Sequence, residues 1–206
     1  GSSFLFSAEA ALPLPGFIQY HKWDFNSAFY TPVAGRLTAS VRPRFGYIGS
    51  LTGDDVRFQR YLIGGTPLEA SGTSSISRGF GRDLVFLRGY PLEAIGPRLD
   101  GQSVGGRILN KYEAELGLLL FQTPQLSLAP YAFADAANTY NGFGDYDPAR
   151  LFRSAGFGAR IFLPILGLVD INMGYQIDEF TPLGTTAGDI EDAQPGWRFQ
   201  FSLGGR

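Results

Sequence analysis

Apolar and polar residues alternate with a period of two along most of this chain. Between Val169 and Asp178, the two kinds of side chain take strictly alternate positions. Successive side chains of a β-strand point to opposite faces, so this pattern predicts strands with one apolar and one polar face. We expect eight such strands, at residues 3–12, 23–29, 37–47, 108–118, 126–137, 155–163, 169–177 and 197–203.

The connections between these segments differ in length in a regular way. Strands of about ten residues can cross a bilayer when they are tilted. From residue 49 onward, long connections (49–106, 138–151 and 179–196) alternate with short ones (122–125 and 164–167), whereas the first two connections (13–16 and 31–35) are both short. Outer-membrane barrels have tight turns at one end and long loops at the other. The sequence therefore predicts an all-β, antiparallel transmembrane β-barrel, with residues 1–206 as a single barrel region. A soluble barrel, with its apolar face inside, is the alternative.

The amino-acid composition argues against several classes of protein. The chain has 28 glycines among 206 residues, 15% aromatic residues and only 17% charged residues, which argues against a disordered chain and a helical bundle. Its 17 basic and 19 acidic residues leave no positive excess for phosphates, so we expect no nucleic-acid partner. With no cysteine and one histidine, disulfide scaffolds and multi-histidine metal sites are excluded, and we expect no metal or cofactor.

Catalytic motifs are not evident. A Ser-His-Asp triad would have to use His21, which the pattern places at a strand start beside Tyr20 and Trp23, where an interfacial role is the simpler interpretation. The sequence contains no nucleophile elbow, phosphate loop or dinucleotide fingerprint. The glycines of Gly156-Phe157-Gly158 lie within a predicted strand and indicate close strand packing. We therefore expect a protein that is not an enzyme.

One ordered set of motifs is more specific. The segment Leu87-Arg88-Gly89-Tyr90 lies in the longest connection and is followed by Ile95-Gly96-Pro97. After it come Gly105-Gly106 with Glu115, then Phe133-Ala134-Asp135, then Arg153-Ser154-Ala155-Gly156 and a Pro164–Gly167 turn. From about residue 3 to the end, the chain resembles the barrel of the BamA family of outer-membrane protein assembly factors, the bacterial surface antigen barrels. Ala137 stands where that family usually has a glycine.

The resemblance implies a location, a function and partners. The chain would be the last eight strands of a sixteen-stranded barrel in a bacterial outer membrane, with POTRA domains and the first strands upstream. Its function would be that of an insertase, which folds and inserts outer-membrane proteins through a lateral seam. The partners would be the lipid bilayer, unfolded outer-membrane proteins and accessory assembly lipoproteins. A two-partner-secretion-type translocation pore and a small passive β-barrel are the alternatives.

The resemblance also assigns roles to residues of the long loop. It implies that residues 49–106 fold into the lumen and that Arg88 pins them there, with Asp135, Glu115 and Glu113 as candidate partners. Gly89 would allow a tight turn, and Tyr90 would pack on the inner wall. Among the other lumen-facing charges, Arg42, Arg44, Lys111 and Arg160, most are interpreted as hydration of a water-filled interior.

The last strand is expected to close the barrel. Gly196, Trp197, Phe199 and Phe201 fit the polar-x-Gly-x-x-aromatic-x-aromatic form of the family's assembly signal. Alternation places the aromatic side chains toward lipid, where aromatic belts are favoured. The resemblance implies a seam at this strand, weakened by a kink at Gly204.

Overall fold

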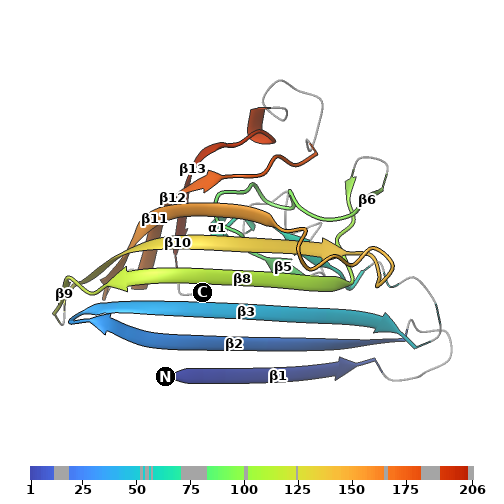
Figure 1. Cartoon of the computed structure of the whole chain (residues 1–206), viewed down its shortest axis with the longest axis horizontal. Coiled ribbons are helices and arrows are strands. Elements are labelled where there is room, and N and C mark those ends of the chain that lie inside the picture. Colours follow the sequence, from blue (N-terminus) through green and yellow to red (C-terminus); the bar gives the residue numbers. More distant parts are fainter. Residues whose placement is uncertain are drawn as a thin grey trace.

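The fold is dominated by one antiparallel sheet. The computed structural model describes residues 1–11, 19–51, 53, 56, 58–70, 83–99, 102–123, 125–164, 167–181 and 191–203. The sheet has nine strands in the order β1-β2-β3-β8-β10-β11-β12-β13, with the short β9 paired to β10. Their bounds are β1 (Ser2–Ala10), β2 (Tyr20–Ala34), β3 (Leu37–Ser50), β8 (Ile108–Leu118), β9 (Phe121–Gln122), β10 (Ser127–Tyr140), β11 (Phe152–Leu163), β12 (Gly167–Gln176) and β13 (Gly196–Leu203). The long strands lie side by side in chain order (Figure 1), which confirms the eight predicted strands and the all-β antiparallel fold.

Several predicted strand ends were wrong. Residues 31–35 were expected to connect two strands, but β2 continues to Ala34 through a register shift between Pro32 and Ala34. A bulge at this point lets the strand pass a proline, which has no N–H to give to the ladder. The chain reverses instead at Gly35, whose φ of 54° favours glycine. At the other end of the sheet, β10 extends to Tyr140, beyond its predicted end at residue 137.

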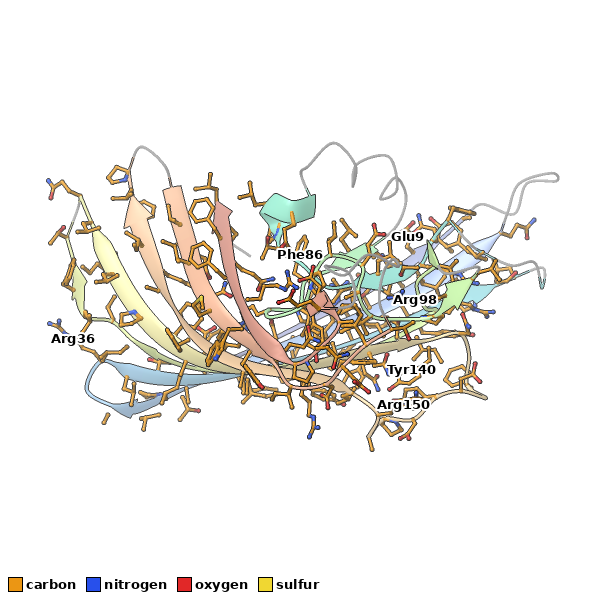
Figure 2. All side chains as sticks on the ribbon, turned by 90° about the horizontal axis from the view of Figure 1, so that it is seen from above. Glu9, Arg36, Phe86, Arg98, Tyr140 and Arg150 are labelled. Atoms are coloured by element: carbon orange, nitrogen blue, oxygen red, sulfur yellow. The ribbon has the colours of Figure 1, made fainter. Side chains whose placement is uncertain are left out.

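The sheet is curved and open. Among the described residues, β1 and β13 are its two edges and do not pair with each other. Figure 2 shows the strands curling into a trough, with Arg36 at one end and Arg98, Tyr140 and Arg150 at the other. The tight turn at Arg36 and the longer connection that ends near Arg150 therefore lie at opposite ends, as the connection lengths predicted. An open sheet does not support the alternative of a small closed barrel.

The two faces of the sheet have inverted polarity relative to a soluble protein. Large apolar side chains are exposed, among them Phe4, Phe25, Phe157, Trp197 and Phe199. Buried positions include many polar side chains, among them Asp24, Glu115, Asp135, Asp170 and Gln200. Exposed apolar surface of this extent is unfavourable in water and is typical of the lipid-facing side of a membrane barrel. The distribution favours the membrane barrel over the soluble alternative.

The concave face is covered by the connection between β3 and β8. This connection contains β4 (Tyr61–Ile63), α1 (Pro67–Ala70), β5 (Asp83–Val85), β6 (Arg98–Leu99) and β7 (Gln102–Ser103). Strands β4 and β5 pair in parallel, and β6 and β7 form a short antiparallel pair. Phe86, from the same connection, lies within the curve of the sheet in Figure 2.

No helix in the described part of the chain is long and apolar enough to cross a membrane.

The apolar core lies between this connection and the sheet. From the connection come Ile63, Val85, Leu87 and Ile95, and from the sheet come Ile48, Leu109 and Ala137, all of them buried in one cluster. A loop that carries its own apolar side chains can be held against a sheet by their removal from water. The loop residues around Ile63 and from Val85 to Ile95 are therefore part of the packed interior.

Candidate functional site: the loop anchored on the concave face

The chain turns at Arg88 and Gly89, deep inside the concave face. Gly89 has a φ of 80°, a backbone conformation that favours glycine. The Arg88 side chain has no exposed surface. Its Nε and Nη2 donate to the two carboxylate oxygens of Asp135, each at 2.6 Å, and Nη1 donates to Glu115 Oε2 at 3.2 Å. The structure therefore brings Arg88 together with two of its three expected partners.

Two aromatic rings of β10 lie next to the same guanidinium. The Arg88 Cζ lies 3.7 Å from the ring centroid of Phe133 and 5.5 Å from that of Tyr131. Glycines on the next strand make room for both rings, because a Cβ at Gly156 would lie 2.9 Å from Phe133 Cζ and one at Gly158 would lie 2.7 Å from the Tyr131 ring. Cations stack favourably on aromatic faces, most strongly where water is excluded. The Gly156-Phe157-Gly158 segment thus gives the close strand packing that its sequence indicated.

Glu115 links Arg88 to charged side chains of other strands of the sheet. Besides Arg88, Glu115 accepts hydrogen bonds from Arg160, with Nη2 at 2.7 Å, and from Arg42 at 3.3 Å. Arg160 also donates to Asp170 at 3.2 Å. The third expected partner, Glu113, pairs with Arg42 at 3.2 Å and with Lys111 at 3.0 Å.

The interpretation of the other lumen charges as mere hydration was wrong. Arg42, Arg44, Lys111 and Arg160 all take part in ion pairs. The reason is the strand register, which sets Arg42 opposite Glu113 and Arg160 opposite Asp170 on neighbouring strands. Opposite charges in such cross-strand pairs attract each other, most effectively where little water screens them.

A second group of contacts holds the beginning of the loop to β2. The Tyr61 hydroxyl donates to Asp24 Oδ2 at 3.0 Å, and Arg44 pairs with the same carboxylate at 3.0 Å. Lys22 pairs with Asp24 at 3.5 Å and with Asp83 of the loop. The ion pairs on this face join six cations, Lys22, Arg42, Arg44, Arg88, Lys111 and Arg160, to six carboxylates, Asp24, Asp83, Glu113, Glu115, Asp135 and Asp170. Among the described residues, Lys22 and Arg44 pair with Asp24 and Asp83, whereas the other four cations pair with the other four carboxylates.

The neighbouring carboxylates favour the charged form of Arg88. Burial alone would lower the pKa of Arg88, but the charge and hydrogen bonds of Asp135, together with the charges of Glu113 and Glu115, offset that effect, and the pKa is raised. A guanidinium is already protonated at any physiological pH, so Arg88 brings a fixed positive charge to this contact. Removing one partner would leave a buried charge unpaired.

The tip of the loop also contacts the last strands of the sheet. Tyr90 is fully buried, and its hydroxyl lies 2.8 Å from the carbonyl oxygen of Arg153 and 3.1 Å from that of Asp178. Its ring packs near Phe152 and Phe180. Tyr90 therefore packs against the inner wall, as expected from the sequence.

The strand β13 forms the edge beyond these contacts. Gly196 begins it opposite Gln176, Trp197 and Phe199 are exposed, and Phe201 is half-buried. The ring centroid of Trp197 lies 5.3 Å from that of Tyr175 and 5.9 Å from that of Phe157, so the exposed aromatic side chains form a cluster. Gly204, the expected kink, lies outside the described residues.

Several residues of this site were not identified from the sequence. They are Tyr61 and Asp83, which hold the loop to β2, and Gln200, which contacts the loop tip. The available signal for Gln200 was its place on the polar face of a strand otherwise rich in aromatic residues, since a buried amide needs partners.

In the described part of the chain, no group of three or more histidine, cysteine or acidic side chains could hold a metal ion.

Comparison with known proteins agrees with this architecture. The Omp85 superfamily domain matches residues 1–206. Among solved structures, the chain is similar to the crystal structure of BamA from Haemophilus ducreyi lacking POTRA domains 1-3, with a TM-score of 0.61 and 20% sequence identity. The match covers 98% of this chain but only 37% of that one, so the chain spans little more than a third of its length. No curated protein sequence matches. The chain thus has a BamA-type barrel fold, belongs to the Omp85 superfamily and is located in a bacterial outer membrane.

Proposed function

We propose that this chain is the C-terminal half of an outer-membrane β-barrel insertase. In this role it folds and inserts other outer-membrane proteins through a lateral seam and makes or breaks no covalent bond. Membership of the Omp85 superfamily supports an assembly or translocation role in general. Its partners would be the bilayer, unfolded outer-membrane proteins, accessory assembly lipoproteins and POTRA domains of the full-length protein.

The observation that carries the proposal is the buried fork between Arg88 and Asp135. It fixes a loop of the β3–β8 connection to β10, in the middle of the wall, while β13 remains an edge of the described sheet. The edge of a sheet presents unpaired N–H and C=O groups, which can pair with an incoming strand. A sheet that is held by contacts with the loop on its concave face can keep its shape while its edge strand pairs with a substrate strand.

The packing of the loop argues for an insertase rather than a translocation pore. Ile63, Leu87 and Ile95 are fully buried between the loop and the sheet, so the concave face under the loop is an apolar core. A polypeptide that crosses the barrel along its axis would have to displace this core and the ion pairs beside it. Insertion at the edge leaves both in place.

The test is reconstitution of the full-length protein that contains this chain into liposomes. We expect it to accelerate the folding of a urea-unfolded outer-membrane protein, measured by the heat-modifiable migration of the folded barrel. Arg88→Ala should greatly reduce this acceleration, because breaking a buried ion pair costs about 3–5 kcal/mol. Arg150→Ala, which removes an exposed arginine from another loop, should not.

Two results would contradict the proposal. Transport of a secreted polypeptide into the liposomes without accelerated folding would indicate a translocation pore. Ion conductance with neither activity would indicate a passive barrel.

A further inference from the structure

A single glutamine connects the loop tip to the edge strand. The Oε1 of Gln200 accepts from the backbone N–H of Gly89 at 2.9 Å, and its Nε2 donates to the backbone carbonyl of Tyr90 at 3.2 Å. Gln200 lies on β13 and is only 2% exposed. Both ends of one buried amide therefore pair with backbone groups of two consecutive loop residues.

Glycines allow the backbones to come this close. A Cβ at Gly174 of β12 would lie 2.8 Å from both the N and the Cα of Gly89, a distance that real side chains do not adopt. Gly174 is the residue directly opposite Arg198, two positions from Gln200 along β13. The loop tip thus lies against the bare backbone of β12 and reaches the side chain of β13 beyond it.

We infer that Gln200 is a positioning residue that couples docking of the loop to the pairing of β13 with β12. This deepens the proposed function and rests on it, because it assigns the loop a role in controlling the seam strand. While the loop is docked, both ends of the Gln200 amide are paired and β13 is held in the sheet. When the loop leaves, both polar ends of a buried amide lose their partners, which is unfavourable until β13 moves and exposes them to water.

The coupling must be reciprocal. If docking of the loop raises the equilibrium constant for pairing of β13 with β12 by some factor, then pairing of β13 raises the equilibrium constant for docking of the loop by the same factor. Arg88 anchors the tip to β10 at one side, whereas Gln200 connects it to β13 at the other. Undocking the loop at Arg88 should therefore loosen β13, although Arg88 makes no contact with β13 among the described residues.

Hydrogen exchange followed by mass spectrometry on the full-length protein tests this inference. Peptides covering 86–95 and 196–203 report on the loop tip and on the edge strand. Gln200→Leu should speed exchange in both segments by at least about fivefold, the lower end of ordinary coupling between sites. Gln200→Asn, which keeps the polarity but shortens the reach, should act in the same direction and tests the idea if the leucine variant does not assemble.

Ser202→Ala is the matched control. Ser202 is buried two residues further along the same strand, and its side chain makes no hydrogen bond to the loop in the described part of the chain. This variant should change neither segment. Arg88→Ala should speed exchange in 196–203, and adding Gln200→Leu to it should produce no further change there.

The inference is overturned if Gln200→Leu loosens only the loop, or if Arg88→Ala leaves exchange in 196–203 unchanged. Neither readout depends on insertion activity. The proposed function can therefore fail in the liposome assay while the coupling holds, and the reverse outcome is equally distinguishable.

Discussion

Arg88 stacks on Phe133 and pairs with Asp135, two residues further along the same strand. The guanidinium carbon lies 3.7 Å from the Phe133 ring centroid, while two of the three guanidinium nitrogens reach Asp135 at 2.6 Å. Because side chains two apart on a strand share a face, β10 presents the ring and the carboxylate together. A planar guanidinium can use its face for the ring and its edge for the carboxylate at the same time.

Arg88→Lys should therefore weaken the anchor although it keeps the charge. An ammonium cannot form the two parallel bonds to Asp135 or the stacking contact. We expect a loss of about 1–3 kcal/mol in the stability of the folded barrel, the range for hydrogen bonds to charged groups. The measurement is the temperature at which the full-length protein loses its heat-modifiable folded form, with Arg150→Lys as control. An unchanged temperature would show that charge alone suffices.

Exchanging the charges tests the pairing itself. Arg88→Glu places a third carboxylate beside Asp135 and Glu115 and should reduce the yield of assembled barrel severely, since an unpaired buried charge costs several kcal/mol. Adding Asp135→Arg should recover part of the yield, because the two side chains touch. Failure to recover any yield would mean that Glu115, which also serves Arg42 and Arg160, is the more important partner.

Gly156 should be intolerant of any side chain. A Cβ there would overlap the carbonyl oxygen of Met173 and lie 2.9 Å from the Phe133 ring. We expect Gly156→Ala to destabilise the folded barrel by about 1–3 kcal/mol, the usual cost of overpacking. Gly117→Ala is the control, because a Cβ at Gly117 would have no neighbour closer than 4.0 Å, and its effect should stay within about 0.5 kcal/mol. Equal effects at both glycines would refute the packing argument.

The aromatic residues of β13 should matter for assembly. Phe199→Ala combined with Phe201→Ala in the full-length protein should lower the amount of barrel recovered in the outer membrane, if this strand carries the assembly signal that its sequence resembles. Phe4→Ala combined with Phe6→Ala is a matched control, since these phenylalanines of β1 are 62% and 60% exposed on the opposite edge. Similar losses for both double substitutions would indicate that these aromatic side chains matter only through their contact with lipid.

The strands, their two faces and the class of fold follow from local patterns in the sequence. Alternation is a local property of the strand, so Val169–Asp178 showed its two faces without knowledge of any neighbour. Motif order located the loop tip at Arg88 and two of its partners, because the residue types carry the chemistry: a guanidinium inside a barrel needs carboxylates.

Tertiary structure decided the remaining contacts. Gln200 meets Gly89 across 111 residues of chain, and Asp83 meets Lys22 across 61, so neither pairing leaves a local pattern in the sequence. The interpretation of Arg42 and Arg160 as merely hydrated was wrong because their partners depend on the register between strands. Register and loop path are set by the packing of the whole sheet, in which a shift of one residue would turn each of these side chains to the lipid face.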